Sequence, residues 1–223
     1  MSKEKTAKPP VARSRGRPRK SETRHEGAKS EQLFHAALRS FAEHGYEATS
    51  LRKIAAEVGV DVALIAHNFG SKRELWDQVI NRIGDDLISA IRTFAEGEAG
   101  GATAIAKLHH AMDSLVDLFC DTPYLAEFVI REATQPEARS DYKYEKLIRP
   151  VHDLLAPLFK QASAEGSLPS IDADFFIFAF AGALALTVSG RPFLATFSAK
   201  ARSDKTFRQN LKQSVLLPLK AGA

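Results

Sequence analysis

Six residues near the amino terminus have the composition of a strip that binds DNA. They are Arg15, Gly16, Arg17, Pro18, Arg19 and Lys20. Pro18 fixes its own backbone and discourages helix at Arg17, and Gly16 lacks the side chain that would obstruct a narrow groove. An extended basic strip of this kind suits the minor groove of A·T-rich DNA, where the electrostatic potential is most negative.

This strip resembles an AT-hook, and it lies in the most basic part of the chain. The net charge is +4, but residues 1–30 contain ten Lys or Arg and three Glu, a net +7, so the remaining residues total −3. A basic arm on a mildly acidic body suggests a polyanionic partner that is reached through one end of the molecule. Such segments also serve as localisation signals or solvated tails, and residues 1–29 are expected to be disordered when free.

A second group of residues that could bind a metal ion or a small molecule lies in the middle of the chain. His109 and Asp113 are one helical turn apart and, with His110, could share a metal with Glu132 or His152. Helical His/Asp pairs are more often surface or pocket groups, so no metal is assigned. The alternative is an inducer cavity, whose candidate lining residues are His109, Asp113, Tyr124, Arg131 and His152.

Motifs and composition argue against several classes of protein. The sequence has no phosphate-binding glycine loop, no Gly-x-Ser-x-Gly elbow and no zinc-protease motif, so no enzyme is expected and no cofactor is assigned. Its one cysteine, Cys120, cannot close an intrachain disulfide, which favours a reducing compartment. The first thirty residues lack an apolar signal core, and the longest mainly apolar run, 175–188, is shorter than the ~18–20 residues of a membrane span. We therefore expect a cytoplasmic protein with no membrane partner.

The elements that position these groups show the period of helices. The first pattern can be capped by Ser30, holds an apolar stripe between residues 33 and 41, and stops at Gly45. A longer pattern begins at the capping box Ser71–Glu74 and continues to about residue 94. Its length suits a strut between two modules.

Two short helices are predicted between these longer ones. The first covers residues 51–58 and ends at Gly59, and Asp61 is placed to cap the second over residues 62–68. In the second, Leu64 and Ile65 are expected to point inward. Two short helices joined by so tight a turn must cross steeply, which is helix-turn-helix geometry.

A family resemblance rests on many residues in register. They are Leu33, Phe34, Ala37, Phe41, Ala42, Glu43, His44, Gly45, Tyr46, Thr49, Ser50, Ile54, Ala55, Val58, Gly59, Val60, Phe69, Ser71, Lys72 and Leu75. With them, the stretch 33–80 resembles the DNA-binding domain of TetR/AcrR-type bacterial transcriptional regulators. The resemblance implies an all-helical C-terminal domain that dimerises and usually holds an inducer pocket, and a preceding basic arm that often enters the minor groove.

The turn and the helix after it depart from the family pattern. Where the family commonly has Ser, Gly, Tyr and His or Tyr, this chain has Asp61, Ala63, Ala66 and Asn68. The carboxylate of Asp61 still supplies a cap, and Ala63 still permits close approach. The tyrosine contact to phosphate or base cannot be carried over to Ala66.

The remaining contacts to DNA are predicted by position. The residues expected to face base edges are Val62, Ala63, Ala66 and His67. Only His67 can donate a hydrogen bond there, whereas the other three could contact thymine methyl groups. The residues expected to anchor phosphates, together with backbone amides at helix starts, are Arg52, Lys53 and Lys72.

The rest of the chain is predicted to be helical. Thr122 can cap a short helix that starts at Pro123, and a long helix over 144–162 is expected to bend at its two prolines. A helix near 173–189 is apolar on all sides and must be covered on all of them. The family resemblance implies that it and a helix near 204–217, with Phe207 and Leu211, form a four-helix interface in a homodimer.

The sequence therefore predicts an all-α protein in three parts. They are a basic arm (1–29), a helix-turn-helix domain (30–76) and a helical ligand-binding and dimerisation domain (77–223). The predicted function is a homodimeric transcriptional regulator, a ligand-responsive repressor that binds a near-palindromic site in double-stranded DNA and responds to a small-molecule effector. The alternatives are an architectural protein of A·T-rich DNA and, less favoured, a helical small-molecule carrier or metal-dependent enzyme.

Overall fold

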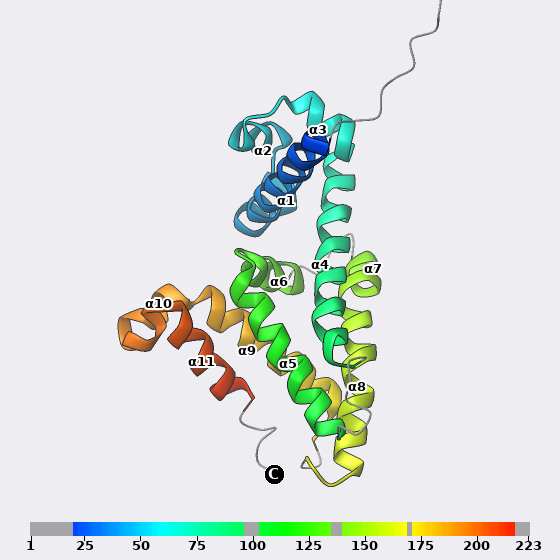
Figure 1. Cartoon of the computed structure of the whole chain (residues 1–223), viewed down its shortest axis with the longest axis vertical. Coiled ribbons are helices and arrows are strands. Elements are labelled where there is room, and N and C mark those ends of the chain that lie inside the picture. The colour runs from blue at the N-terminus through cyan, green and yellow to red at the C-terminus, as the bar shows by residue number, and fades with distance from the viewer. Residues whose placement is uncertain (1–19, 96–102, 135–139, 169–170, 217–223) are drawn as a thin grey trace, which may run out of the picture.

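A computed structural model describes residues 20–95, 103–134, 140–168 and 171–216. All regular elements in these ranges are helical, which confirms the all-α prediction. Three helices form one end of the molecule, α4 runs from that end along the body, and the later helices form a second module (Figure 1).

The first module consists of α1 (Lys20–Ala48), α2 (Leu51–Val58) and α3 (Val62–Phe69), followed by α4 (Lys72–Ala95). The second consists of α5 (Ala104–Asp121), α6 (Leu125–Thr134), α7 (Ser140–Lys143), α8 (Arg149–Ala164), α9 (Ala173–Ser189), α10 (Arg191–Phe197) and α11 (Asp204–Val215). A π-helical turn (Tyr144–Ile148) joins α7 to α8, and a 3-10 turn (Ala199–Arg202) joins α10 to α11.

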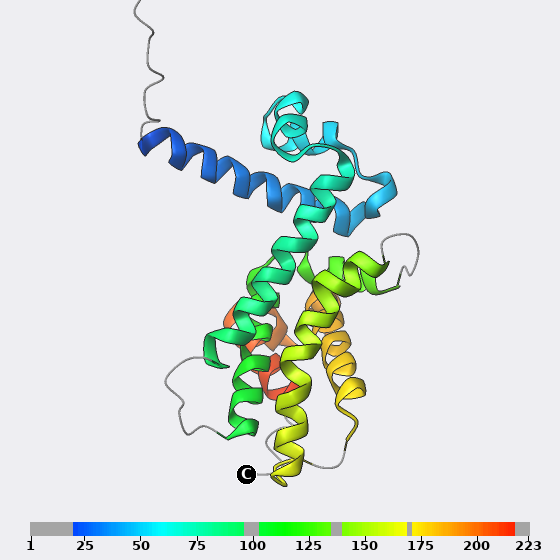
Figure 2. The same cartoon turned by 90° about the vertical axis from the view of Figure 1, so that its right-hand side faces the viewer.

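The first helix starts earlier than predicted. Helix α1 begins at Lys20, so Ser30 is not its cap, and the expected domain boundary between residues 29 and 30 falls inside a helix. Extending an existing helix adds one hydrogen bond for each residue without a new nucleation cost, and residues 20–29 contain no proline. The helical geometry is interrupted at the predicted stop, Gly45, with φ 75°. Figure 2 shows the amino-terminal part of α1 projecting from the body.

The predicted tight turn lies between α2 and α3. Gly59 adopts the left-handed conformation with φ 67°, which glycine reaches without strain, and its N–H donates to carbonyls of α2. Asp61 caps α3, because its carboxylate accepts a 2.7 Å hydrogen bond from the N–H of Ala63. Ser50 occupies the cap position of α2, although its hydroxyl makes no capping bond. The turn therefore fixes the angle between the two short helices.

The capping box predicted at the start of α4 is present. The Ser71 N–H donates to the Glu74 carboxylate at 2.7 Å, and the Glu74 N–H donates to the Ser71 hydroxyl at 3.2 Å. The Ser71 hydroxyl also donates to the Glu74 carboxylate, at 2.8 Å, and the bonds donated by the Ser71 N–H and hydroxyl lower the pKa of Glu74. At 1.5 Å per residue, the 24 residues of α4 span about 36 Å. Its buried side, which includes Trp76 and Ile80, contributes to the continuous core that runs through both modules.

Two joints in the second module differ from the prediction. Helix α6 begins at Leu125 rather than at Pro123, because Tyr124 has φ 66°, a left-handed conformation that is rare for a residue with a bulky side chain. The predicted long helix over 144–162 is interrupted by the π-helical turn, after which Pro150 lies in the first turn of α8. Pro is tolerated there because it needs no hydrogen-bond partner for an N–H. Pro157 remains inside α8.

Helix α9 leaves much of its apolar surface uncovered. Phe175, Phe178 and Leu186 are 80%, 70% and 67% exposed, and Phe193 and Phe197 on α10 are similarly open. In contrast, Phe207 and Leu211 of α11 are buried within the protomer, so these two side chains do not line a dimer interface. The amphipathic α11 directs this stripe toward α5 and α9. The participation of α11 in a dimer stays a prediction. No single described helix is long and apolar enough to cross a membrane, and α9 with α10 meets that measure only as a pair bent by 73°.

Candidate nucleic-acid interface

One side of α3 holds it to the molecule and the other side is open. Ile65 is buried, and Phe69, one turn later, packs against the core. The predicted base-facing residues Val62, Ala63, Ala66 and His67 are all exposed. The helix that follows the tight turn therefore presents these four side chains to the surroundings.

The prediction that Leu64 points inward was wrong. Its side chain is 42% exposed. Successive residues of an α-helix are about 100° apart, so a helix held at Ile65 and Phe69 turns residue 64 toward its flank. The i, i+4 spacing of Ile65 and Phe69 was the signal in the sequence that could have placed Leu64 correctly.

The predicted phosphate anchors have two different environments. Arg52 and Lys53 are exposed in the first turn of α2. Lys72 instead donates to the carbonyls of Glu47, at 3.0 Å, and Thr49, at 3.3 Å. Its ammonium also lies 4.6 Å from the centre of the Tyr46 ring. Lys72 therefore ties the start of α4 to the end of α1, and Arg52 and Lys53 are the better-placed cations for a polyanion.

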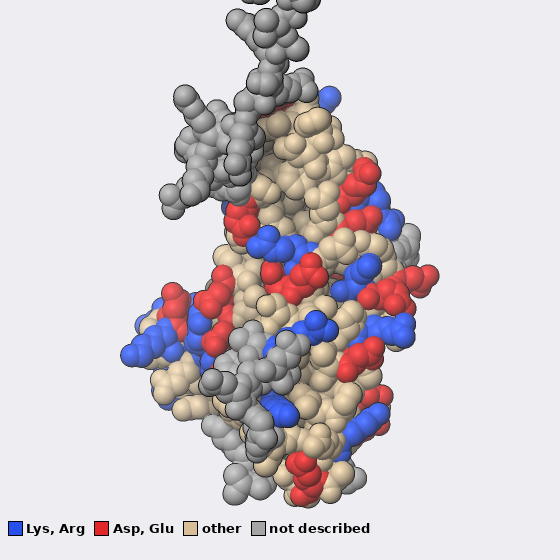
Figure 3. Space-filling model, turned by 45° about the vertical axis from the view of Figure 1, so that its right-hand side comes forward, with Lys and Arg blue, Asp and Glu red and all other residues tan. Residues whose placement is uncertain are grey.

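Helix α3 itself contains no Asp, Glu, Lys or Arg. On the face drawn in Figure 3, acidic and basic side chains gather around the middle and lower parts of the molecule. The described surface above them, at the helix-turn-helix end, is mostly uncharged. Side-chain contact through α3 therefore involves no Arg or Lys of this helix, and the exposed cations at the start of the neighbouring α2 are Arg52 and Lys53. Residues 15–19 of the predicted AT-hook-like strip lie outside the described residues, and Lys20 is the first residue of α1.

An arginine from the second module links this module to the helix-turn-helix end. Arg131 of α6 donates to the carbonyl of Ala42 at 2.6 Å and to that of Glu43 at 2.9 Å. These carbonyls belong to the last turns of α1, where a cation is favourable. Arg131 therefore acts as an interdomain contact, a role that sequence reasoning missed when it placed this residue in an effector cavity.

A second interdomain contact involves Arg39 of α1. Its guanidinium forms an ion pair with Glu57 of α2 and lies 5.8 Å from the centre of the Tyr124 ring. Hydrogen bonds with Glu57 and Tyr124 raise the pKa of Arg39. An open hollow of about 480 Å³ lies here, and Arg39, Tyr124, Glu57 and Gln32 are among its lining residues. Tyr124, one of the predicted effector residues, thus lines this hollow.

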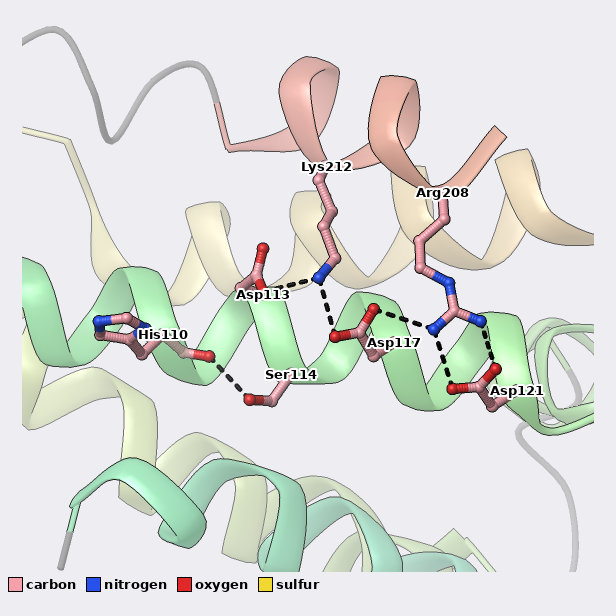
Figure 4. A network of polar contacts seen from close by, with 7 residues as sticks. All are labelled: His110, Asp113, Ser114, Asp117, Asp121, Arg208 and Lys212. Atoms are coloured by element: carbon pink, nitrogen blue, oxygen red, sulfur yellow. Dashed lines mark hydrogen bonds and ion pairs between the residues drawn. The ribbon is translucent and has the colours of Figure 1, made fainter. Parts of the chain in front are cut away.

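The five predicted effector residues do not gather at one site: Tyr124 and Arg131 contact α1, whereas the others make contacts elsewhere in the second module. Asp113 on α5 accepts a 2.7 Å hydrogen bond from Lys212 on α11, within a ladder of ion pairs between these helices (Figure 4). Burial alone would lower the pKa of Lys212, but the hydrogen bonds that its ammonium donates to Asp113 and Asp117 raise this pKa. His109 packs edge-on against His110. The described residues contain no group of three metal-ligating side chains that could hold an ion.

His152 of α8 contacts Asp174 of α9. We expect this contact to make a pH-dependent contribution to the stability of the fold. Its Nε2 lies 2.9 Å from Asp174, and hydrogen bonds with Asp174 and Asp153 raise its pKa above the ordinary 6.5. The bond with His152 lowers the pKa of Asp174 below 3.8. The other charges nearby are Arg149, which pairs with Asp153, and Lys160 near Asp174.

Because folding raises the pKa of His152, its protonated form stabilises the folded state. This contribution to stability is fully present below pH 6.5 and is lost as the pH rises through the pKa of His152 in the folded protein. We expect the difference in unfolding free energy between the protein and His152→Gln to shrink between pH 6 and pH 8. The change should stay below about 1 kcal/mol, because both side chains are partly exposed. Urea unfolding at several pH values measures it, and a difference that grows with pH would contradict this sign.

Comparison with protein families gives a match at the DNA-binding end. A sequence model described as bacterial regulatory proteins of the tetR family matches residues 33–79. The HTH-type transcriptional dual regulator CecR of Shigella flexneri is 33% identical over 137 residues, which cover 57% of this chain and 61% of that regulator. The chain thus matches less than two thirds of the length of CecR. The HTH-type transcriptional activator FasR of Mycolicibacterium smegmatis is 38% identical over 61 residues, which cover 27% of this chain and 28% of the FasR chain.

Solved structures extend the likeness of the fold to both modules. FadR of Bacillus subtilis, solved in complex with stearoyl-CoA, has a TM-score of 0.64 and 20% identity, covering 87% of this chain and 99% of its own. The TetR-family regulator PfmR of Thermus thermophilus has a TM-score of 0.64 and 18% identity, covering 84% and 97%. At these identities the comparison shows a shared fold.

Proposed function

Because the chain belongs to the TetR family of bacterial regulatory proteins, we propose that it is a ligand-responsive repressor that binds a near-palindromic operator as a homodimer. The observation that carries the proposal is the open outer side of α3, held at a fixed angle by the Gly59–Asp61 turn. A helix presented in this way can enter the major groove while α2 contacts the backbone. Such a protein acts on the chromosome, and we place it in the cytoplasm.

Selection from random duplexes with the full-length protein tests DNA binding. We expect recovery of one family of sites with two inverted half-sites. An architectural protein would instead recover diffuse A·T-rich sequences with no defined centre. A reporter gene carrying the recovered site then tests the sign of regulation. The named relatives include a dual regulator and an activator, and repression predicts that deleting the protein raises expression from the reporter.

The exposed stripe of α9 supports the homodimer. Phe175, Phe178 and Leu186 share one side of the helix with three small exposed residues, Ala179, Gly182 and Ala183. No atom lies within 4 Å of the position that a side chain at Gly182 would occupy. Large residues at the ends and small ones in the middle let two copies of α9 cross closely about a two-fold axis. We place Phe193 and Phe197 of α10 beside this crossing, since they are also exposed.

The basic arm predicts a salt-dependent contribution to DNA binding. We expect a variant lacking residues 1–19, which leaves α1 whole, to bind the selected duplex more weakly and with a flatter dependence on salt. If Arg15, Arg17 and Arg19 of each protomer neutralise one phosphate apiece, the dimer makes six such contacts and the slope of log K against log salt falls by roughly 5. Titrations between 50 and 200 mM salt measure the slope. An unchanged slope would reduce the arm to a tail, and Arg→Gln at the three arginines is the matched control for length.

We place the effector in the second module. FadR of Bacillus subtilis, which shares the fold, was solved in complex with stearoyl-CoA, which supports a small-molecule effector. A ligand shifts an equilibrium only by binding one conformation better than the other. In this protein, α4 and the contacts of Arg131 and Tyr124 with α1 connect the second module to the DNA-binding end. An effector that moves α6 changes the spacing of the two α3 helices, which must be about 34–36 Å apart on successive major grooves.

A further inference from the structure

The outer side of α3 indicates how the protein selects its DNA sequence. We propose that α3 recognises thymine-containing base pairs chiefly through apolar contact with their C5-methyl groups, with Leu64 as the principal contact residue. The inference rests on the proposed function, because it requires α3 to enter the major groove. It adds the chemistry of the contact and the base that is read.

The geometry of α3 places apolar side chains where base edges would lie. Ala63 and His67 point almost directly away from the buried Ile65, about 160° around the helix. Leu64 and Ala66 flank them, each about 100° from Ile65. Leu64 is the largest of the outward side chains on this face and is 42% exposed. A folded monomer gains nothing from an open leucine, whereas the floor of a major groove can cover it.

The chemistry of these side chains restricts which bases they can distinguish. In the major groove thymine alone presents a methyl group, while guanine, adenine and cytosine present hydrogen-bonding groups. Residues 62–66 have only aliphatic side chains, and no Arg or Lys occurs within α3. The commonest contact to guanine, a bidentate cation, is therefore not available from this helix.

The polar groups of α3 lie outside its apolar part. The carboxylate of Asp61 is engaged with the N–H of Ala63, and as an anion it is unsuited to phosphate. His67 and Asn68 follow toward the carboxyl end and line an open hollow that also includes Glu74. Hydrogen-bonded recognition is therefore limited to the end of the helix, and the first turn and a half is left to apolar contact.

The experiment compares thymine with deoxyuridine, which lacks only the methyl group. The selected operator is synthesised with each thymine of one half-site replaced in turn, and the dissociation constant is measured for the full-length protein. Covering one methyl contributes roughly 0.8 kcal/mol, so a contacted position should weaken binding about fourfold. Replacement in both half-sites should weaken binding by more than tenfold. The salt dependence should stay unchanged, because no phosphate contact is lost.

Two variants assign the contact. Leu64→Ala should bind the thymine operator more weakly and lose the preference for thymine over deoxyuridine at one position of each half-site. Arg52→Ala is the control: it should weaken binding to both duplexes by the same factor and flatten the salt dependence. Circular dichroism of both variants should match the parent protein, since both residues are exposed.

The results separate the inference from the function on which it rests. A selected operator that binds equally well with deoxyuridine at every position would overturn methyl recognition and leave DNA binding intact. Full retention of the thymine preference in Leu64→Ala would overturn the role of Leu64. A failure to recover any duplex at low salt would instead remove the proposed function.

Discussion

Phe178→Glu is expected to turn the protein into a monomer and to weaken operator binding by roughly a hundredfold or more. Phe178 is 70% exposed on α9, so a carboxylate there is well solvated in the single protomer. In the proposed dimer it would be forced into the apolar crossing of two α9 helices, where an unpaired charge is strongly unfavourable. A monomer binds each half-site independently. In the dimer, binding of one protomer holds the second close to its own half-site at a high effective concentration, and the monomer loses this gain in affinity.

Sedimentation equilibrium and a binding titration measure the two effects of Phe178→Glu. Ala164→Glu, at the exposed end of α8, is the matched control and should remain dimeric with unchanged affinity. Gly182→Leu gives an independent check, because a Cβ added at Gly182 has no atom of the protomer within 4 Å, whereas a leucine there would hold two crossing helices apart. A Phe178→Glu variant that stays dimeric would place the interface elsewhere.

The buried ion pair between Glu132 and Lys143 predicts the largest effect on stability. The side chains are 5% and 8% exposed, with the ammonium 3.1 Å from the carboxylate and 2.8 Å from the backbone carbonyl of Glu132. Glu132→Ala leaves a buried ammonium without its carboxylate, which typically costs about 3 kcal/mol or more. For a chain of this size the melting temperature should fall by roughly 6–12 °C.

Thermal unfolding at a fixed protomer concentration measures this loss, because oligomers melt in a concentration-dependent way. Glu127→Ala, a partly exposed position on the same helix, should change stability by only about 0.5 kcal/mol. The double variant Glu132→Leu with Lys143→Met removes both charges and should recover most of the loss. Equal melting temperatures for Glu132→Ala and Glu127→Ala would show that the pair contributes nothing.

The helices that the sequence predicted well are those with local signals. The Ser71–Glu74 capping box, the Asp61 cap and the Gly59 stop are each set by neighbouring residues, and the structure contains all three. The start of α1 was predicted wrongly because Ser30 has the chemistry of a cap yet lies inside a longer helix. A residue such as Ser30 can cap a helix, but it can also lie within one. A helix that extends further toward the amino terminus can be more stable than one that begins at this residue.

The candidate site depends on contacts between segments that are far apart in the sequence. Such contacts were harder to predict from the sequence than the starts and ends of helices. The carbonyls that accept from Lys72 lie in residues 47 and 49, and those that accept from Arg131 lie 88 and 89 residues away. No periodic pattern relates such pairs. The sequence predicted that α9 is an apolar helix. Only the packing shows that Phe207 and Leu211 of α11 are buried within their own protomer while Phe193 and Phe197 of α10 are exposed.

The most direct test of the account is a hydroxyl-radical footprint of the full-length dimer on its selected duplex. The account predicts two symmetric protected segments centred about one helical turn, 10–10.5 base pairs, apart, each facing the same side of the duplex. Both segments should disappear together with Phe178→Glu. Protection spread evenly over A·T-rich stretches, or a single unpaired segment, would contradict recognition by two α3 helices related by a two-fold axis.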